Sequence, residues 1–365
     1  MKKIICTVTN DLVYDQRMIR ICNSLTKAGY QVRLVGRKKH NSPTLPSLAF
    51  DQRRLSCFFQ KGKWFYLEYN LRLFFYLLVT PYDLICAIDL DTLGPGYFTS
   101  KLKGKICVYD AHEYFTETPE VVRRPWIQRI WAALARLIIP RLKYAYTVGD
   151  QLAQLFEKQY GIPFTVIRNV PHASPQHAVN SSKEIKVLLY QGALNEGRGL
   201  EVTIQAMQYL PNVELWLAGE GDLSEALRQM TEDLKLTDRV KFLGYIRPEE
   251  LKSLTKQAYI GLNLLENNGL SYYYSLANKA FDYIQAGIPS LHMDFPEYRN
   301  LQDQYEVFLL ADRLEATYIA QLIQHLLQHP DLYQKLQHNC HQAAKTLNWA
   351  QEEQRLLRFY KNIVW

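Results

Sequence analysis

The residues best suited to ligand chemistry lie between positions 275 and 287, in the segment SLANKAFDYIQAG. Asn278 and Lys279 stand at the expected start of a helix, and Asp282 follows about one turn later. A carboxylate accepts hydrogen bonds from two adjacent ribose hydroxyls, and a lysine pairs with phosphate. The segment therefore predicts a nucleotide site. Taken singly, Asp282 is equally explained as a helix-dipole partner and Lys279 as a surface salt bridge.

Two glycine-containing segments follow strand-like runs in the same half of the chain. The segment QGALNEGRG (residues 191–199) contains Gly192 and Gly199 and carries Arg198, and a second turn begins at Gly219. Glycines let backbone N–H groups approach a phosphate, and an arginine adds positive charge there. Neither segment is a dinucleotide fingerprint or a Walker loop. An ordinary turn with a solvated arginine is the alternative.

A further candidate cluster lies in the first half of the chain. In the segment YDAHE (residues 109–113), His112 stands between Asp110 and Glu113 at the end of a strand-like run. A histidine flanked by carboxylates is a site candidate because its neighbours set its charge. Residues 89–93 form a similar acidic strand end. Neither segment has the paired-ligand spacing of a metal site, so no metal is predicted.

Strand-like and helix-like patterns alternate along nearly the whole chain. The pattern pauses in the polar stretch 169–186 and then restarts. Such alternation predicts parallel sheets with helices on both faces, and ligands bind beyond the carboxyl ends of their strands. We therefore expect an α/β protein with two doubly wound, Rossmann-like domains facing a central cleft. The expected domains are residues 1–170 and residues 183–348.

The composition and net charge of the chain limit which ligands, partners and cellular location are expected. The chain has 365 residues, of which 48% are apolar, and a net charge of +7. This charge suits a polyphosphate ligand, an anionic membrane or nucleic acid. Because the basic residues are dispersed and form no contiguous stripe, no nucleic-acid partner is predicted. The six scattered cysteines, the lack of a signal peptide and the lack of an 18-residue apolar run favour a cytoplasmic location.

Two segments combine basic and aromatic residues. Residues 123–139 place four arginines beside Trp126 and Trp131, and residues 61–66 precede the apolar run 71–79. Basic residues beside tryptophans suit a membrane interface. Packing of an amphipathic helix on its own sheet is the alternative for each segment. Peripheral contact with the cytoplasmic face of an anionic membrane and internal packing thus both stay open.

Four segments together resemble glycosyltransferase family 4, in its bacterial polysaccharide and lipopolysaccharide group. They are NDLVYDQR (residues 10–17), YDAHE (109–113), the glycine loop 192–199 and LANKAFDYIQAGIP (276–289), the last being the most specific. The resemblance implies a GT-B fold with residues 349–365 packing back on the N-terminal domain. It also implies retaining, metal-independent transfer of a hexosyl-type sugar from a nucleotide-sugar to a glycan or lipid-linked acceptor in polysaccharide synthesis. No cofactor is expected beyond the nucleotide-sugar substrate.

The same resemblance assigns roles to individual residues. His112 would contact the donor sugar or the charge that develops on it, while Arg198 and Lys279 would contact the diphosphate. Asp282 would accept the ribose hydroxyls. The remaining donor-site residues are Asn278, Gly192, Gly199 and Gly219. The acceptor-side residues are Asn10, Asp11 and Arg17.

Two positions depart from the family pattern. Tyr274 stands where the first of two paired glutamates is expected, and Ala193 stands at the position of the loop arginine. Either Lys279 compensates, or the donor binds weakly, or the chain is inactive. The alternatives are thus a non-catalytic sugar-nucleotide-binding protein on a decayed transferase scaffold, and a sugar-nucleotide epimerase, which shares the GT-B architecture.

Overall fold

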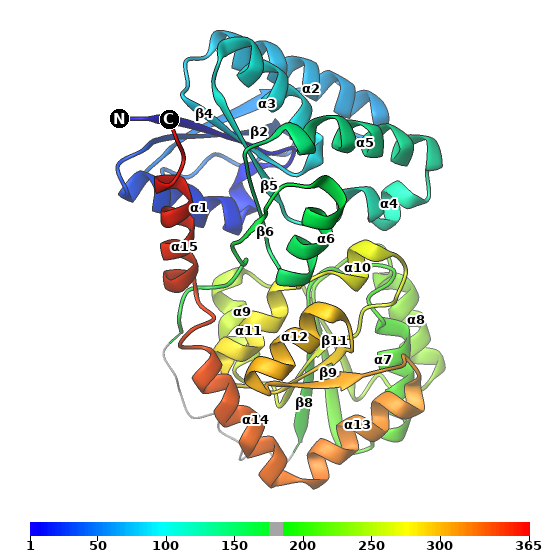
Figure 1. The fold of residues 1–365 in the computed structure, drawn as a ribbon. Helices are drawn as coiled ribbons and strands as arrows, with labels where there is room; N and C mark the ends of the chain where they lie inside the picture. The colour runs from blue at the N-terminus through cyan, green and yellow to red at the C-terminus, as the bar shows by residue number, and fades with distance from the viewer. Residues whose placement is uncertain (175–184) are drawn as a thin grey trace. The chain divides into compact units, whose positions relative to one another are not determined.

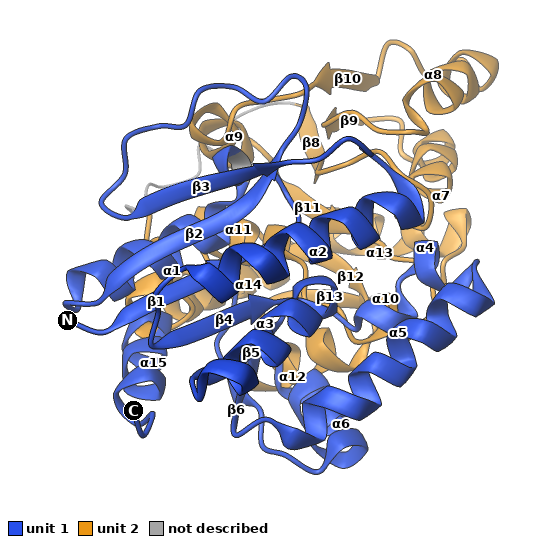
Figure 2. Ribbon diagram, turned by 90° about the horizontal axis from the view of Figure 1, so that it is seen from above, with its two compact units in different colours: residues 1–169, 352–365 blue, residues 170–351 orange. Residues whose placement is uncertain are grey.

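The computed structural model describes residues 1–174 and 185–365, which form two compact units. Unit 1 comprises Met1–Asn169 and Glu352–Trp365, and unit 2 comprises Val170–Gln351 (Figure 2). The last helix, α15 (Trp349–Lys361), begins in unit 2 and belongs to unit 1 from Glu352 onward. Most of the predicted linker, and the predicted domain start at residue 183, lie outside the described residues.

Unit 1 contains a seven-stranded parallel sheet in the order β3-β2-β1-β4-β5-β6-β7. The strand order reverses between β1 and β4, the point where an open α/β sheet offers a ligand site. The central strands are almost wholly buried, as expected for a parallel sheet covered on both faces. The strands are β1 (Lys3–Thr7), β2 (Gln31–Lys38), β3 (Asp51–Ser56), β4 (Leu84–Ile88), β5 (Ile106–Ala111), β6 (Tyr144–Thr147) and β7 (Thr165–Val166).

Helices cover both faces of this sheet (Figure 1). One face carries α2 (Gly62–Val79), α3 (Leu90–Lys103) and α5 (Pro125–Ile138), with α3 in contact with both of the others. The opposite face carries α1 (Gln16–Lys27) and α15, which are joined by a hydrogen bond from Ser24 to Glu353. The other helices are α4 (Pro119–Val122) and α6 (Asp150–Tyr160), with short 3₁₀ turns at Leu12–Tyr14, Phe115–Glu117 and Ile139–Arg141.

Unit 2 contains a six-stranded parallel sheet in the order β10-β9-β8-β11-β12-β13, which reverses between β8 and β11. Apolar side chains of the sheet and of the surrounding helices form one large buried core, and a second, smaller cluster contains Leu189, Tyr283 and Ile288. The strands are β8 (Lys186–Gln191), β9 (Val213–Ala218), β10 (Val240–Gly244), β11 (Ile260–Asn263), β12 (Ser290–Met293) and β13 (Phe308–Ala311).

The helices of unit 2 alternate with these strands. The predicted helix near residue 278 is α11 (Asn278–Ala286), and Gly287 ends it in the left-handed conformation at φ 73°. The others are α7 (Leu200–Ala206), α8 (Ser224–Asp233), α9 (Pro248–Thr255), α10 (Leu270–Tyr273), α12 (Pro296–Tyr305), α13 (Ala316–Gln328) and α14 (Pro330–Ala343), with a 3₁₀ turn at Met207–Tyr209. The predicted class, α/β with two Rossmann-like domains, is confirmed. Among the described residues, none of the helices is long and apolar enough to cross a membrane.

Candidate active site

The loops after β8 and β9 touch through their backbones at two glycines. Gly192 has φ 136° and Gly219 has φ 155°. A Cβ on Gly219 would lie 1.8 Å from the carbonyl oxygen of Gly192, which no larger residue could tolerate. Gly199, at φ 65°, is similarly restricted, because a Cβ there would lie 2.1 Å from the carbonyl oxygen of Leu264. The predicted glycines therefore hold these loops close together at the carboxyl edge of the sheet.

Lys279 is buried beside this edge and forms no ion pair within 4 Å with any residue that the structure describes. Its side chain is 9% exposed, and its Nζ lies 3.8 Å from the ring centroid of Tyr190. Nζ is also 3.4 Å from the position that a Cβ on Gly192 would occupy. Burial lowers the pKa of Lys279 well below its usual value, the charge of Arg198 lowers it further, and Asp282 opposes these effects only in part.

Arg198 brings a second positive charge to the same place. Its guanidinium lies 5.0 Å from the ring centroid of Tyr272, and its buried Nε has no hydrogen-bond acceptor among the described residues. The charge of Arg198 lowers the pKa of both Lys279 and the Tyr190 hydroxyl, so the three side chains lie close together. Two basic side chains thus converge where the described part of the chain supplies only a weak counter-charge. Such a site favours a bound polyanion.

Asp282 is oriented by a residue that the sequence did not single out. Gln191, the last residue of β8, donates a hydrogen bond from Nε2 to Asp282 Oδ2 at 2.9 Å. The Thr255 hydroxyl in turn donates to Gln191 Oε1 at 2.8 Å. Gln191 is 4% exposed, whereas Asn278 is exposed on the first turn of α11. The end of a strand in a parallel sheet was the sequence signal that could have identified Gln191.

A buried polar network supports the start of α11 from behind. The Tyr298 hydroxyl accepts hydrogen bonds from the Ala277 backbone N–H at 3.0 Å and from Asn263 Nδ2 at 2.8 Å. Asn263 Nδ2 also lies 3.2 Å from His292 Nδ1, and His292 Nε2 lies 2.8 Å from Ser290 Oγ. Burial lowers the pKa of His292 to about 3, so its ring is neutral. The sequence pattern places Asn263, Ser290 and His292 in strand-like runs and gives no sign that they join Tyr298 in a network.

Tyr274 occupies the position where the resemblance expected a glutamate. It follows α10 directly and is half-buried, with its ring centroid 5.1 Å from that of Tyr273 in an edge-on contact. Ala193 is exposed in the loop after β8, and its carbonyl oxygen accepts a hydrogen bond from the Tyr190 hydroxyl at 2.8 Å. Neither position therefore contributes charge to the site.

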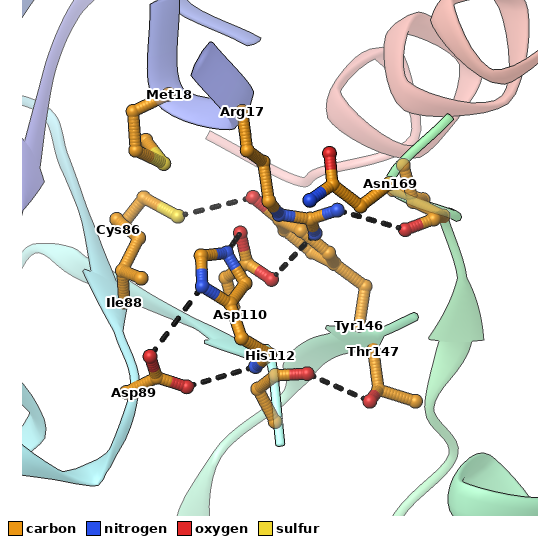
Figure 3. Close-up of polar contacts among 12 residues, drawn as sticks. Arg17, Met18, Cys86, Ile88, Asp89, Asp110, His112, Tyr146, Thr147 and Asn169 are labelled. Carbon is orange, nitrogen blue, oxygen red and sulfur yellow. Dashed lines mark hydrogen bonds and ion pairs between the residues drawn. The ribbon is translucent and has the colours of Figure 1, made fainter. Parts of the chain in front are cut away.

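In unit 1, His112 lies between two carboxylates at the carboxyl ends of β4 and β5 (Figure 3). Its Nδ1 is 3.4 Å from Asp89 Oδ2, and its Nε2 is 3.5 Å from Asp110 Oδ2. Its backbone N–H also donates to Asp89 Oδ1 at 2.8 Å. Burial would lower the pKa of His112, but Asp89 and Asp110 together outweigh that effect and raise it to about 10. The imidazole is therefore positively charged at neutral pH.

Arg17 belongs to the same charge cluster. Its Nη2 is 2.8 Å from Asp110 Oδ1, and its Nη1 donates to the Ile167 carbonyl oxygen at 3.2 Å. Arg17 is 3% exposed and Asp110 is fully buried. Burial raises the pKa of Asp110, but the charges of Arg17 and His112 outweigh it, so the pKa stays below its usual range. The structure thus links Arg17, predicted on the acceptor side, to the predicted catalytic His112 through one carboxylate.

Asn10 and Asp11 take part in local structure beside this cluster. Asn10 Nδ2 donates to Asp15 Oδ2 at 2.8 Å, and Asp15 caps the start of α1. Asp11 is 7% exposed and accepts a hydrogen bond from Arg54 Nη1 at 3.1 Å and another from the Ser42 hydroxyl. Within the described ranges, no hydrogen bond or ion pair joins either residue to His112 or Arg17. The three predicted acceptor-side residues therefore do not form one contact group.

Comparisons with known proteins agree with this architecture. Residues 175–346 match the family model described as glycosyl transferases group 1. Over 101 residues, 26% of this chain, the sequence is 31% identical to the lipopolysaccharide core biosynthesis glycosyltransferase LpsD of Rhizobium meliloti. The segments aligned with the three curated relatives span 29%, 22% and 20% of those proteins.

Two solved structures share the fold over nearly their full length. Sucrose-phosphate synthase from Thermosynechococcus elongatus has a TM-score of 0.81 at 16% identity, covering 99% of this chain and 98% of that one. Anabaena HepE, solved in complex with UDP-glucose, has a TM-score of 0.74 at 16% identity, and the match covers 100% of both chains. The family match confirms the predicted resemblance to glycosyltransferases, and these structures confirm the fold.

Proposed function

On the premise that residues 175–346 match the group 1 glycosyltransferases, we propose that the chain is a retaining, metal-independent glycosyltransferase. It moves a hexosyl-type group from a nucleotide-sugar donor to a glycan or lipid-linked acceptor in cell-surface polysaccharide synthesis. The proposal rests on two basic side chains, Lys279 and Arg198. They lie together at the glycine loops, where the described residues offer little negative charge. A diphosphate supplies the negative charge that this site lacks.

In the proposed donor complex, the diphosphate lies against Lys279 and Arg198, and Asp282 accepts the two ribose hydroxyls. Gln191 holds the Asp282 carboxylate in place by its 2.9 Å hydrogen bond. Binding of the diphosphate raises the pKa of Lys279 back toward its usual value, because the new anion offsets burial and the charge of Arg198. A uridine nucleotide is the first donor to test, since HepE was solved with UDP-glucose.

During transfer, the acceptor oxygen bonds to the anomeric carbon from the face that the diphosphate leaves. The bond from the anomeric carbon to the diphosphate oxygen breaks, and the acceptor proton passes to that phosphate group. Arg198 and Lys279 neutralise the charge that accumulates on the leaving nucleoside diphosphate. Two protein cations thus take the role that a metal ion serves in other transferases.

For His112, the proposed partner is a hydroxyl of the transferred sugar. A positively charged imidazolium donates hydrogen bonds, so it can hold a hydroxyl oxygen of that sugar in place. Arg17 then acts as a positioning residue, because it fixes Asp110 and through it His112. Asn10 and Asp11 remain proposed acceptor-side residues. A lipid-linked acceptor would place the protein at the cytoplasmic face of a membrane.

The test combines binding and turnover. Thermal-shift titration with UDP, GDP, ADP and their sugars should single out one base, because a ligand stabilises the state that it binds. With the donor so identified, Arg198→Ala should raise the barrier to transfer by roughly 2–4 kcal/mol, as loss of one oxyanion donor does. The matched control is Lys252→Met, at an exposed position on α9. Unchanged turnover in Arg198→Ala, or binding of no nucleotide by the parent chain, would overturn the proposal.

A non-catalytic sugar-nucleotide-binding protein is the second candidate, favoured by the uncharged positions Tyr274 and Ala193. Donor hydrolysis separates the two, because a catalytic site can pass the sugar to water when no acceptor is present, whereas a site that only binds cannot. Tight binding of one sugar nucleotide, with neither hydrolysis nor transfer across a panel of glycan and lipid-linked acceptors, would assign the chain to this second class.

A further inference from the structure

Helix α2 in unit 1 is apolar on two opposite faces. Its inner stripe, Phe65, Tyr69, Leu73 and Leu77, is buried against the sheet. Its outer stripe recurs every three or four residues and consists of Trp64, Leu67, Leu71, Phe75 and Leu78, which are 54%, 51%, 51%, 62% and 38% exposed. A helix on the surface of a water-soluble unit normally has one polar face. The outer stripe of α2 therefore needs a second apolar environment.

Helices α5 and α3 continue this apolar surface. On α5, Trp126, Ile130 and Leu137 form an exposed stripe, and on the neighbouring α3, Phe98 and Leu102 are exposed. Because α3 packs against both α2 and α5, the three helices lie side by side on one face of the unit 1 sheet (Figure 2), so their exposed residues belong to one surface. The loop before α2 adds Phe58 and Phe59. We call the exposed residues of α2, α3, α5 and this loop the outer helical face.

The charges on the outer helical face are almost all positive. Within α2, α3 and α5 the acidic residues are Glu68, which pairs with Arg72 at 2.8 Å, and Asp91, which is buried. Several cations lie over aromatic rings, among them Arg129 over Trp126 at 5.3 Å. The exposed basic residues within these helices are Lys63, Arg72, Lys101, Arg129 and Arg136, and the N-cap residues Lys61 and Arg124 of α2 and α5 are exposed as well.

We propose that the outer helical face binds the surface of an anionic lipid bilayer, with α2 and α5 lying along the interface. Tryptophan rings suit the boundary between acyl chains and headgroups, and lysine and arginine side chains reach the headgroup phosphates while their stems cover apolar surface. The charge argues against a second copy of this chain as the occupant. A symmetric dimer through this face would set its cations against the same cations of the other copy.

Vesicle sedimentation of the full chain tests the proposal without donor or acceptor, so its outcome is independent of the proposed transfer reaction. The protein should sediment with phosphatidylcholine vesicles that contain phosphatidylglycerol, and much less with phosphatidylcholine alone. Added salt should reduce the binding. Arg129→Gln combined with Arg136→Gln should weaken the partition coefficient on anionic vesicles roughly tenfold or more. Phe75→Ser combined with Ile130→Ser should weaken binding to a similar degree.

The matched control is Tyr209→Ser combined with Tyr245→Ser, two exposed aromatic residues of unit 2. All these positions are exposed, so each variant should keep the parental melting temperature and nucleotide-induced thermal shift. The proposal is overturned if the parent ignores anionic vesicles, if it binds neutral vesicles equally well, or if both outer-face variants bind like the control. A dimer in light scattering that Phe75→Ser/Ile130→Ser dissociates would instead assign the face to a second copy.

Discussion

At the scale of single residues, Lys279 has opposite effects in the free and bound protein. Its positive charge lowers the stability of the free protein but strengthens the binding of an anion. Its amine is buried beside a ring, close to another cation. Its pKa in the folded chain lies well below the value of about 10.4 in an unfolded chain. Protonation of Lys279 at neutral pH therefore opposes folding. This contribution reduces stability progressively as the pH falls from about 10.4 toward the folded-state pKa.

Replacing Lys279 should consequently separate stability from binding. Lys279→Met removes a buried cation while keeping an unbranched side chain, so the free protein should gain roughly 1–2 kcal/mol in its free energy of unfolding. The same variant should lose the thermal shift that the preferred nucleotide induces in the parent. Denaturant unfolding and thermal-shift titration measure the two effects, with Lys252→Met as control. A variant that unfolds more easily while still binding nucleotide would contradict this account of Lys279.

His112 shows the opposite pH behaviour. Its pKa is raised from about 6.5 in an unfolded chain to about 10 in the folded chain by Asp89 and Asp110. The stabilisation that these carboxylates provide is therefore complete below about pH 6.5 and is lost as the pH rises toward 10. NMR titration of labelled histidine rings should show no midpoint for His112 between pH 6 and 8. His112→Gln identifies its signal, and a midpoint near 6.5 would refute the paired-carboxylate geometry.

At the scale of elements, the start of α11 depends on a side chain from α12. The Tyr298 hydroxyl accepts the Ala277 backbone N–H, and Ala277, the N-cap residue, has no polar side chain with which to cap the helix. Tyr298→Phe leaves that N–H and the Asn263 amide without this acceptor, which should cost roughly 1–3 kcal/mol. Because α11 carries Lys279 and Asp282, we expect severalfold weaker nucleotide binding as well.

Hydrogen exchange provides the structural readout for this effect. Amide protection at residues 277–279 should fall in Tyr298→Phe and stay unchanged in Tyr305→Phe, which alters a half-buried tyrosine on the same helix. A purely global loss of stability would instead lower protection throughout unit 2. Equal protection at the start of α11 in both variants would show that the Tyr298 hydroxyl does not hold this helix.

At the scale of the whole molecule, unit 1 is completed by the last residues of the chain. Leu356 and Tyr360 of α15 are fully buried, and Glu352 accepts a hydrogen bond from the Arg168 backbone N–H at 3.0 Å. A chain ending at residue 351 should therefore lose stability in unit 1 and keep it in unit 2. Calorimetry should show an early transition for unit 1, followed by one that the preferred nucleotide still raises. A single unshifted transition would exclude this dependence.

Much of the fold could be predicted because strands and helices leave local, periodic signals. Alternating apolar runs and amphipathic segments indicated two parallel sheets, and the polar stretch near residue 175 indicated where the pattern changes. The chemistry-bearing residues Arg198, Lys279 and Asp282 were recognisable for a related reason. Each follows closely on a glycine turn or a helix start, and the carboxyl ends of parallel strands gather such positions at one edge.

What the sequence could not show are contacts between residues far apart along the chain. Gln191 meets Asp282, Arg17 meets Asp110, and α2 lies beside α3 and, through it, near α5. These contacts depend on strand order and on which face each crossover helix covers, and neither leaves a periodic trace in the sequence. The sequence by itself thus determined the elements and the kinds of residue at their ends. Tertiary structure decided which charges meet and which apolar faces stay uncovered, because packing alone sets distances between elements.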